Sequence, residues 1–195
     1  MNTSLSILIP AAGDSSRLGQ AKQLVEFADK PLLQHTIDTA LSISPFEVIT
    51  IIGAQSERIR NAIDARQVKW LVNPDWRKGL GGTIAVGAKS VDPACTGVLV
   101  ILCDQWRIER SDLLDLVAAW QSEPDAIVTA SRDDQTMPPV IFPSDCLEQL
   151  AQLSGQRGAQ TLLKAQPERV RMVAMKNAAF DLDYPHQLPD LNKKP

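Results

Sequence analysis

The chain has 195 residues, 44% of them hydrophobic and 22% charged, so it is long enough to bury one sizeable core but short for two. Its formal net charge of -3 gives no overall basic field of the kind that attracts nucleic acid, so we expect small-molecule partners and no nucleic acid. No apolar run reaches membrane-spanning length and no secretion signal is evident, so we expect a cytoplasmic protein with no membrane partner.

Apolar, β-branched runs alternate with segments of helical period, which is the pattern of a mostly parallel sheet with helices on its faces. This alternation predicts an α/β fold in a single domain covering residues 1–195. Residues 131–139 resemble a polar loop that enters a strand, and we expect the tail from Tyr184 to be loose or docked on the surface. We predict strands at residues 5–9, 48–52, 68–72, 98–102, 126–129, 140–142 and 170–173, and helices at about 31–42, 57–65, 83–90, 110–121, 145–153 and 158–164.

Three cysteines, Cys95, Cys103 and Cys146, are scattered along the chain without a paired metal-ligand spacing. Cys103 ends an apolar run, where a buried thiol is the ordinary expectation. We therefore expect neither disulfides nor a structural zinc site.

The loops that follow the first strands are expected to share one edge of the sheet. In open α/β sheets, ligands bind beyond the carboxyl ends of the strands. The loops at residues 10–22, 53–56, 73–82 and 104–107 should therefore meet around one site.

The loop "PAAGDSSRLGQAK" has the composition of a polyphosphate-binding segment. Gly13 lets the backbone approach a ligand, successive N–H groups can bind an anion, and Arg17 and Lys22 add positive charge. The loop is neither a Walker A motif nor the dinucleotide GxGxxG fingerprint. The alternative is a plain strand-to-helix turn with a solvated arginine and lysine.

Carboxylates follow two of the predicted strands. Asp104 stands at the carboxyl end of "VLVIL", where it could hold Mg²⁺ or serve only as a turn residue. Asp181 and Asp183 point to the same side of an extended segment, so either could be a second metal ligand, and surface turn acids are the alternative.

The segment "NPDWRKGLGGTIAVGA" combines Asn-Pro with closely spaced glycines ahead of a small-residue helix. Thr83 opens that helix, whose N-terminus could face a ligand. Trp76 could stack on a bound molecule or pack only on the core.

Taken in order, these segments resemble the MobA-like nucleotidyltransferases. "PAAGDSSRLGQAKQL" is similar to the family signature "LAAGxSxRMGxxKxLL". "NPDWRKGLGGTIAVG", "VLVILCDQ", "PPVIF" and "LSGQRGAQTLL" follow in the order of the molybdenum cofactor cytidylyltransferase branch. The resemblance extends from about residue 6 to residue 184.

The resemblance implies a Rossmann-like three-layer sandwich that transfers CMP from CTP to the terminal phosphate of a molybdopterin-type cofactor and releases pyrophosphate. Residues from about 1 to 110 would bind the nucleotide and those from about 111 to 195 the acceptor, and a molybdenum hydroxylase could receive the product. The resemblance implies that Arg17, Lys22 and Asp104 are the catalytic residues and that Asp104 and Asp183 hold Mg²⁺. The implied nucleotide-binding residues are Ala11, Ala12, Gly13, Arg17, Lys22, Gly79, Gly81, Gly82 and Thr83.

Several positions depart from the family pattern. Trp106 follows Gln105 where the family has proline, Gln156 replaces an acidic residue, and Tyr184 changes the segment after Asp183. Asp29 replaces a glycine in a turn, which aspartate tolerates because it can adopt positive φ. These departures leave two alternatives open: a nucleotidyltransferase for a sugar or alcohol phosphate, and a non-catalytic carrier of the molybdenum cofactor.

Overall fold

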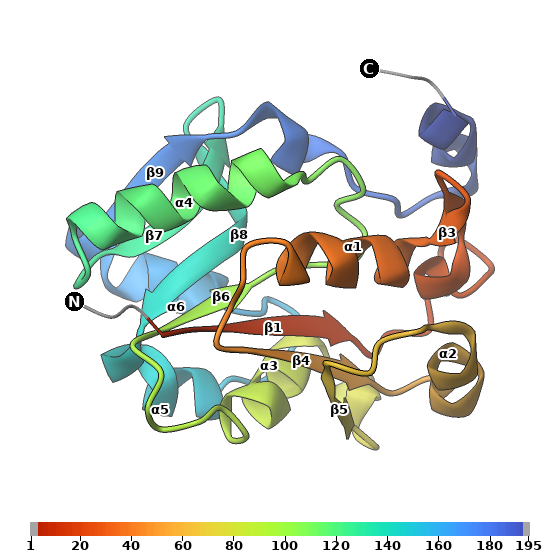
Figure 1. Cartoon of the computed structure of the whole chain (residues 1–195), viewed down its shortest axis with the longest axis horizontal. Coiled ribbons are helices and arrows are strands. Elements are labelled where there is room, and N and C mark those ends of the chain that lie inside the picture. Colours follow the sequence, from red (N-terminus) through yellow and green to blue (C-terminus); the bar gives the residue numbers. More distant parts are fainter. Residues whose placement is uncertain (1–3, 193–195) are drawn as a thin grey trace.

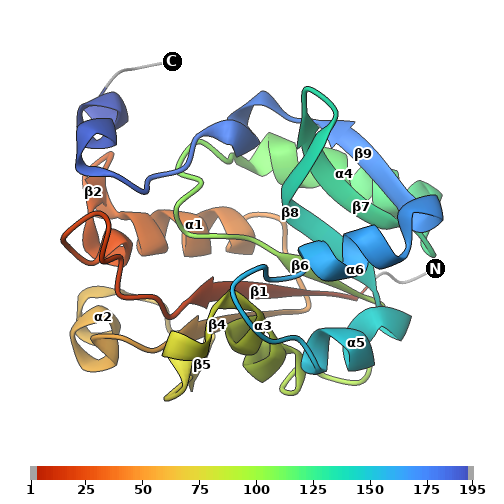
Figure 2. The ribbon, with the colours of Figure 1, turned by 180° about the vertical axis from the view of Figure 1, so that it is seen from behind.

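Strand β1 (Leu5–Ala11) lies inside a seven-stranded sheet in the computed structural model, which describes residues 4–192. It pairs in parallel with β4 (Glu47–Ile52) on one side and β6 (Gly97–Val100) on the other. β4 pairs in parallel with β5 (Lys69–Val72), which forms one edge. The full order is β5-β4-β1-β6-β8-β7-β9, and helices cover both faces (Figure 1; Figure 2).

The other half of the sheet contains its antiparallel part. β8 (Gln135–Pro143) runs antiparallel to both β6 and β7 (Ile127–Arg132), and β7 pairs in parallel with β9 (Val170–Ala174). The prediction of a polar loop at 131–139 is therefore wrong, because this segment forms a β-hairpin. Asp133 and Asp134, both with positive φ, make its two-residue turn, so the polar residues mark the turn rather than an irregular loop.

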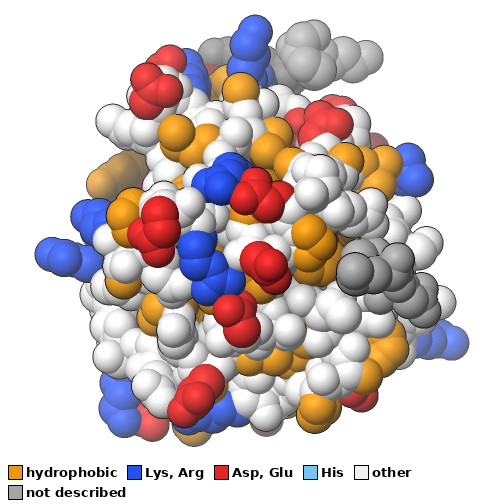
Figure 3. Space-filling view, turned by 90° about the vertical axis from the view of Figure 1, so that its left-hand side faces the viewer, with side chains coloured by type: hydrophobic (Ala, Val, Ile, Leu, Met, Phe, Trp, Pro, Cys, Tyr) orange, Lys and Arg blue, Asp and Glu red, His pale blue; other side chains and the backbone are white. Residues whose placement is uncertain are grey.

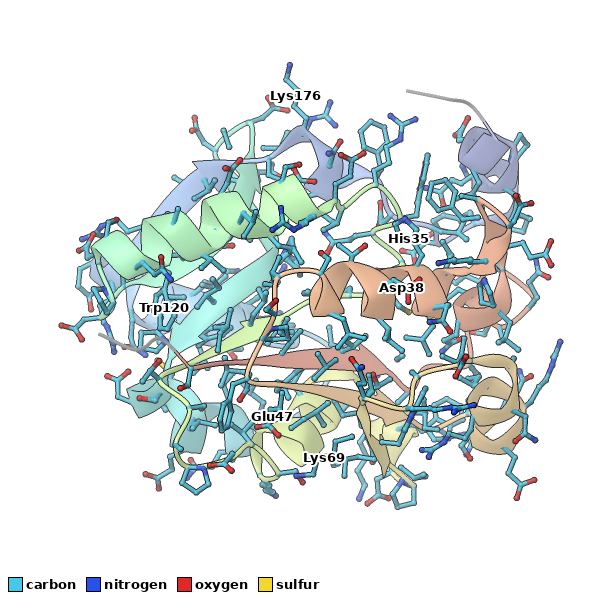
Figure 4. The ribbon with its side chains drawn as sticks, in the orientation of Figure 1. His35, Asp38, Glu47, Lys69, Trp120 and Lys176 are labelled. Atoms are coloured by element: carbon cyan, nitrogen blue, oxygen red, sulfur yellow. The ribbon has the colours of Figure 1, made fainter. Side chains whose placement is uncertain are left out.

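Alternating side chains divide the core into two layers. Ile7 and Ile9 of β1 pack in the cluster that contains the apolar faces of α1 (Leu32–Leu41), α2 (Ser56–Ala62) and α4 (Arg110–Ser122). Leu8 packs on the opposite face with α3 (Leu80–Ala88), α5 (Leu147–Ala151) and α6 (Gln160–Ala165). Trp120 lies between α4 and the sheet and is fully buried (Figure 4). The three-layer α/β prediction is confirmed.

The predicted elements are all present, with shifted ends. α3 begins at Leu80 rather than at Thr83, because the N–H group of Gly81 donates to the carbonyl oxygen of Gly155 at 2.8 Å across the fold. Asp29 has a φ of 61°, as expected for its turn. The short elements are β2 (Glu26–Phe27), β3 (Lys30–Pro31), η1 (Lys22–Leu24), η2 (Trp76–Lys78), η3 (Ser144–Cys146), η4 (Pro167–Arg169), η5 (Lys176–Ala179) and η6 (Pro185–Asn192).

A third, smaller cluster docks the C-terminal segment on the body of the protein. Trp106 is buried there against Leu182 and Leu191, together with residues from the first loop and α1. Its ring also makes edge-to-face contacts with Phe27 and Phe180 at centroid distances of 5.2 and 6.1 Å. The tail is therefore docked rather than loose over residues 184–192, and its last three residues lie outside the described part of the chain. The tryptophan that departs from the family pattern is a core residue.

The three cysteines are free and buried, and burial was predicted for Cys103. Lysine, arginine and acidic side chains are intermixed on the face shown in Figure 3. Within residues 4–192, no helix combines the length and apolarity needed to cross a bilayer.

Candidate functional site

A cavity of about 530 Å³ opens at the carboxyl ends of β1 and β6. Its wall includes the loop after β1, the residues that follow β6, Leu80 from α3, and Gln156 and Asp183 from distant parts of the chain. Residues of the loops at 10–22, 73–82 and 104–107 therefore meet around the cavity as expected, whereas no residue of the loop at 53–56 lines it. Ala11, Gly13, Arg17, Lys22, Asp104 and Asp183 all line this cavity.

Lys22 lies between two carboxylates in the cavity. Its Nζ donates to Asp104 Oδ2 at 2.7 Å and to Asp183 Oδ1 at 2.8 Å. Burial by itself lowers the pKa of Lys22, but the charge of Asp104 and the hydrogen bonds to both carboxylates outweigh burial and raise the pKa above its ordinary value. Lys22 therefore stays protonated throughout the neutral range.

Asp183 reaches the site through backbone contacts. The N–H group of Leu182 donates to the carbonyl oxygen of Asp104 at 3.0 Å, which joins the two segments. The side-chain oxygen of Gln187 accepts hydrogen bonds from the N–H groups of Asp183 and Tyr184 at 2.8 and 2.7 Å. Asp181, the alternative metal ligand, is exposed and does not line the cavity.

The two carboxylates are of the kind that Mg²⁺ binds, and Lys22 donates to one oxygen of each. Oδ1 of Asp104 is buried and has no hydrogen-bond partner among the described residues, so it is an acceptor left free for a cation. Within residues 4–192, no group of three histidine, cysteine or acidic side chains gathers around a metal position. Mg²⁺ commonly uses one or two carboxylates and takes its remaining ligands from water and substrate phosphates.

The side chain of Gln23, which the sequence did not indicate as a site residue, fixes the conformation of the loop after β1. The buried amide of Gln23 donates from Nε2 to the carbonyl oxygens of Ala11 and Gly13, both at 2.8 Å. Within the described chain, the N–H groups of Gly13, Asp14 and Ser15 donate to no other group, so they are free to bind an anion. Gln23 adjoins Lys22 in the sequence, but no local pattern indicates that its amide turns back to the loop.

A second cavity of about 440 Å³ adjoins the first and shares Gly13 and Gln156 with it. Ala12, Gly79 and Thr83 line this second cavity, together with Trp76.

Gly81 and Gly82 line neither cavity among the described residues. A Cβ added at Gly81 would lie 2.6 Å from the carbonyl oxygen of Ser154, whereas one added at Gly82 would meet nothing within 4 Å. Gly81 therefore allows close approach of the 154–156 loop.

Two further buried amides hold the loops around the site. Asn73 Nδ2 donates to Thr83 Oγ1 at 3.0 Å. Gln105 Nε2 donates to the carbonyl oxygens of Pro138 and Ala178 at 2.6 and 2.7 Å. Burial raises the pKa of Cys103 to about 12, so this neighbouring thiol stays protonated and is not a nucleophile.

The fold and the cavity define an α/β domain with its ligand site at the carboxyl edge of a mostly parallel sheet. Residues 7–170 match the MobA-like NTP transferase domain, and the chain belongs to that family.

Curated relatives align with part of the chain. The chain is 32% identical over 134 residues to the bifunctional protein GlmU of Burkholderia orbicola, an alignment that covers 68% of this chain and 29% of GlmU. The chain thus spans less than a third of the length of the curated relatives it matches.

Solved structures share the whole fold. Rv0371c from Mycobacterium tuberculosis is 25% identical, with a TM-score of 0.87 over 98% of each chain. A structure of Rv0371c with manganese gives 24% identity and a TM-score of 0.76 over 89% of each chain. A CMP:2-keto-3-deoxy-manno-octonic acid synthetase solved with CTP has the same fold at 17% identity, with a TM-score of 0.74 over 97% of each chain.

Proposed function

We propose that this protein is a cytidylyltransferase that transfers CMP from CTP to the terminal phosphate of a molybdopterin-type cofactor and releases pyrophosphate. The observation that carries the proposal is the placement of Lys22 between Asp104 and Asp183, beside a loop with free N–H groups. A molybdenum hydroxylase would receive the product.

The choice of CTP and of molybdopterin rests on the sequence motifs of the branch. The family match supports the transfer of a nucleotidyl group, and a structure of the same fold solved with CTP is compatible with this donor.

The residues of the cavity supply what this reaction needs. Attack of a phosphate oxygen on the α-phosphorus of CTP brings two strongly anionic groups together, so positioning and charge neutralisation dominate catalysis. The free N–H groups of the Gly13–Ser15 segment would bind triphosphate oxygens, and Arg17, exposed at the cavity, would add charge. Lys22, held protonated by its two carboxylates, would bind the charge that develops on the transferred phosphate.

Asp104 and Asp183 would hold Mg²⁺, with the unpartnered Oδ1 of Asp104 as one ligand atom. When bound, the ion would neutralise part of the triphosphate charge and favour departure of pyrophosphate. No protein nucleophile is required, which agrees with the protonated state of Cys103.

The proposal is tested by incubating the protein with each NTP in turn, Mg²⁺ and molybdenum-loaded molybdopterin while pyrophosphate release is measured. We expect turnover with CTP to exceed turnover with the other nucleotides. Absence of turnover with every NTP would overturn the proposal. Turnover of CTP with sugar or alcohol phosphates but not with molybdopterin would favour the alternative acceptor class, and calorimetric binding of molybdopterin without nucleotide binding would favour a carrier.

A further inference from the structure

A third cavity, of about 560 Å³, lies in the half of the protein proposed to bind the acceptor. Arg107, the tip of the β7–β8 hairpin, the segment after β9 and Phe180 surround it. Its described lining shares no residue with the two cavities at the loop after β1. The proposed transfer of CMP gives this cavity no role, although three basic side chains line it: Arg107, Arg132 and Lys176.

Arg107 is a half-buried cation that makes no ion pair with any acidic side chain within residues 4–192. Its guanidinium carbon lies 4.6 Å from the ring centroid of Trp106 and 4.0 Å from that of Phe180. Its Nε is buried and donates no hydrogen bond within the described part of the chain. A buried donor on a charged group is costly when unsatisfied, and the aromatic contacts leave that N–H unpaired. Arg107 lines the cavity, so an anionic group bound there would offset this positive charge.

The remaining charges of the cavity favour the same class of ligand. Arg132 and Asp133 lie 3.5 Å apart and neutralise each other. Lys176 makes no ion pair within residues 4–192 and projects outward from the top of the molecule (Figure 4), so it stands at the rim. Arg107 and Lys176 therefore leave the cavity with two uncompensated positive charges.

The cavity lies close to the proposed transfer site because the same two segments border both. One segment runs from Asp104 to Arg107, and the other runs from Phe180 to Asp183. Three residues of extended chain span at most about 11 Å, which bounds the distance between the Cα atoms at the two ends of either segment. The hydrogen bond from Gln105 to Ala178 ties the two segments together. The two cavities therefore border the same pair of segments.

We propose that this cavity binds a second negatively charged group of the acceptor, apart from the phosphate that attacks CTP. This inference rests on the proposed function and narrows its acceptor to molecules that carry anionic groups at both ends. A sugar or alcohol phosphate with a neutral distal end does not meet that requirement.

Direct anion binding is tested by titrating the ¹⁵N-labelled full chain with inorganic phosphate, using chloride at equal ionic strength as the reference. We expect a saturable shift of the Arg107 Nε–H signal and of backbone signals around Ser131 and Asn177. Arg107→Gln should weaken this binding about 10- to 100-fold, as expected for a lost charge-assisted hydrogen bond. Arg60→Gln is the matched control, because the Arg60 guanidinium also lies over a ring, that of Trp70 at 4.8 Å, but outside the cavity.

No saturable shift in the wild type, or equal affinity in Arg107→Gln, would overturn the anion site. If Arg107→Gln does not fold, Lys176→Gln replaces it in the phosphate titration, because Lys176 is at the exposed rim of the same cavity. We expect Lys176→Gln to bind phosphate more weakly than the wild type, and an unchanged affinity would contradict the proposal.

Turnover with CTP and molybdenum-loaded molybdopterin tests the link to the acceptor. Arg107→Gln should raise KM for the acceptor about 10- to 100-fold while KM for CTP stays unchanged. An unchanged acceptor KM would overturn the inference. If the wild type shows no turnover with any NTP, the proposed function fails. The anion site is judged separately by the phosphate titration, and saturable binding at Arg107 would show that this site exists even when the proposed function is wrong.

Discussion

Two adjacent glycines in α3 have different roles, and alanine substitutions can separate them. Gly81 packs against the backbone of the 154–156 loop, where an added Cβ would lie 2.6 Å from the oxygen, 2.7 Å from the carbonyl carbon and 2.9 Å from the nitrogen of Ser154. Gly82 has nothing within 4 Å of its added Cβ. Gly81→Ala therefore forces a backbone segment to move, whereas Gly82→Ala does not.

The size of the effect follows from two opposing contributions. Alanine is favoured over glycine within a helix by at most about 1 kcal/mol, and this gain is common to both substitutions because both glycines lie in the first turn of α3. Overpacking typically costs about 1–3 kcal/mol, and only Gly81→Ala incurs it. We therefore expect the free energy of unfolding of Gly81→Ala to be about 1–3 kcal/mol lower than that of Gly82→Ala.

Urea denaturation of the two variants and the wild type measures this difference directly. Gly82→Ala should be as stable as the wild type or more stable. Because the moving loop carries Gln156 into both cavities at the loop after β1, Gly81→Ala should also raise KM for the substrates. Equal stability of the two variants would refute the close approach of Gly81 to Ser154.

Three other substitutions test different parts of the argument. Lys22→Ala should lower kcat/KM by an amount equivalent to about 3–4 kcal/mol of transition-state stabilisation. Lys69→Ala, on edge strand β5, is the control and should leave kcat/KM unchanged. Equal kcat/KM values for the two variants would contradict the role of Lys22. Burial lowers the pKa of His35 in the folded protein, so the free energy of unfolding should fall as pH drops below about 6.5, the pKa of an unfolded histidine. Chemical denaturation at pH 7.5 and 5.5 measures this fall, which should be smaller for His35→Gln than for the wild type. Trp106→Ala should lower the free energy of unfolding by about 3–5 kcal/mol and loosen the C-terminal segment that carries Asp183. Limited proteolysis measures that loosening, and an unchanged rate of cleavage in the segment would contradict its docking on Trp106.

Much of the fold is predictable because its signals are local. Apolar β-branched runs such as residues 48–52 define buried strands, and helical periodicity between them defines the covering layers. The β7–β8 hairpin is missed because Asp133 and Asp134 resemble loop residues, although their positive φ angles make a tight turn. The strand ends on both sides of this two-residue turn are polar, so they lack the alternating apolar and polar residues by which a strand is recognised in a sequence.

The candidate site divides in the same way. Arg17, Lys22 and Asp104 are identifiable because they follow predicted strands, where ligands of open sheets bind. Gln23, Asn73 and Gln105 are not identifiable, because their roles depend on carbonyl and hydroxyl groups brought near by folding. The roles of Gly81 and Trp106 likewise depend on neighbours that no local pattern specifies.

The sequence by itself determined the α/β layering and the family, because both depend on residue types at short, regular spacing. Only the tertiary structure decided that Lys22 meets Asp104 and Asp183, which lie 82 and 161 residues away along the chain. It alone brought Arg107, the hairpin tip and the segment after β9 around one cavity. The physical reason is that such contacts arise from packing of the whole sheet and its helices, and their free energy is not carried by any one segment.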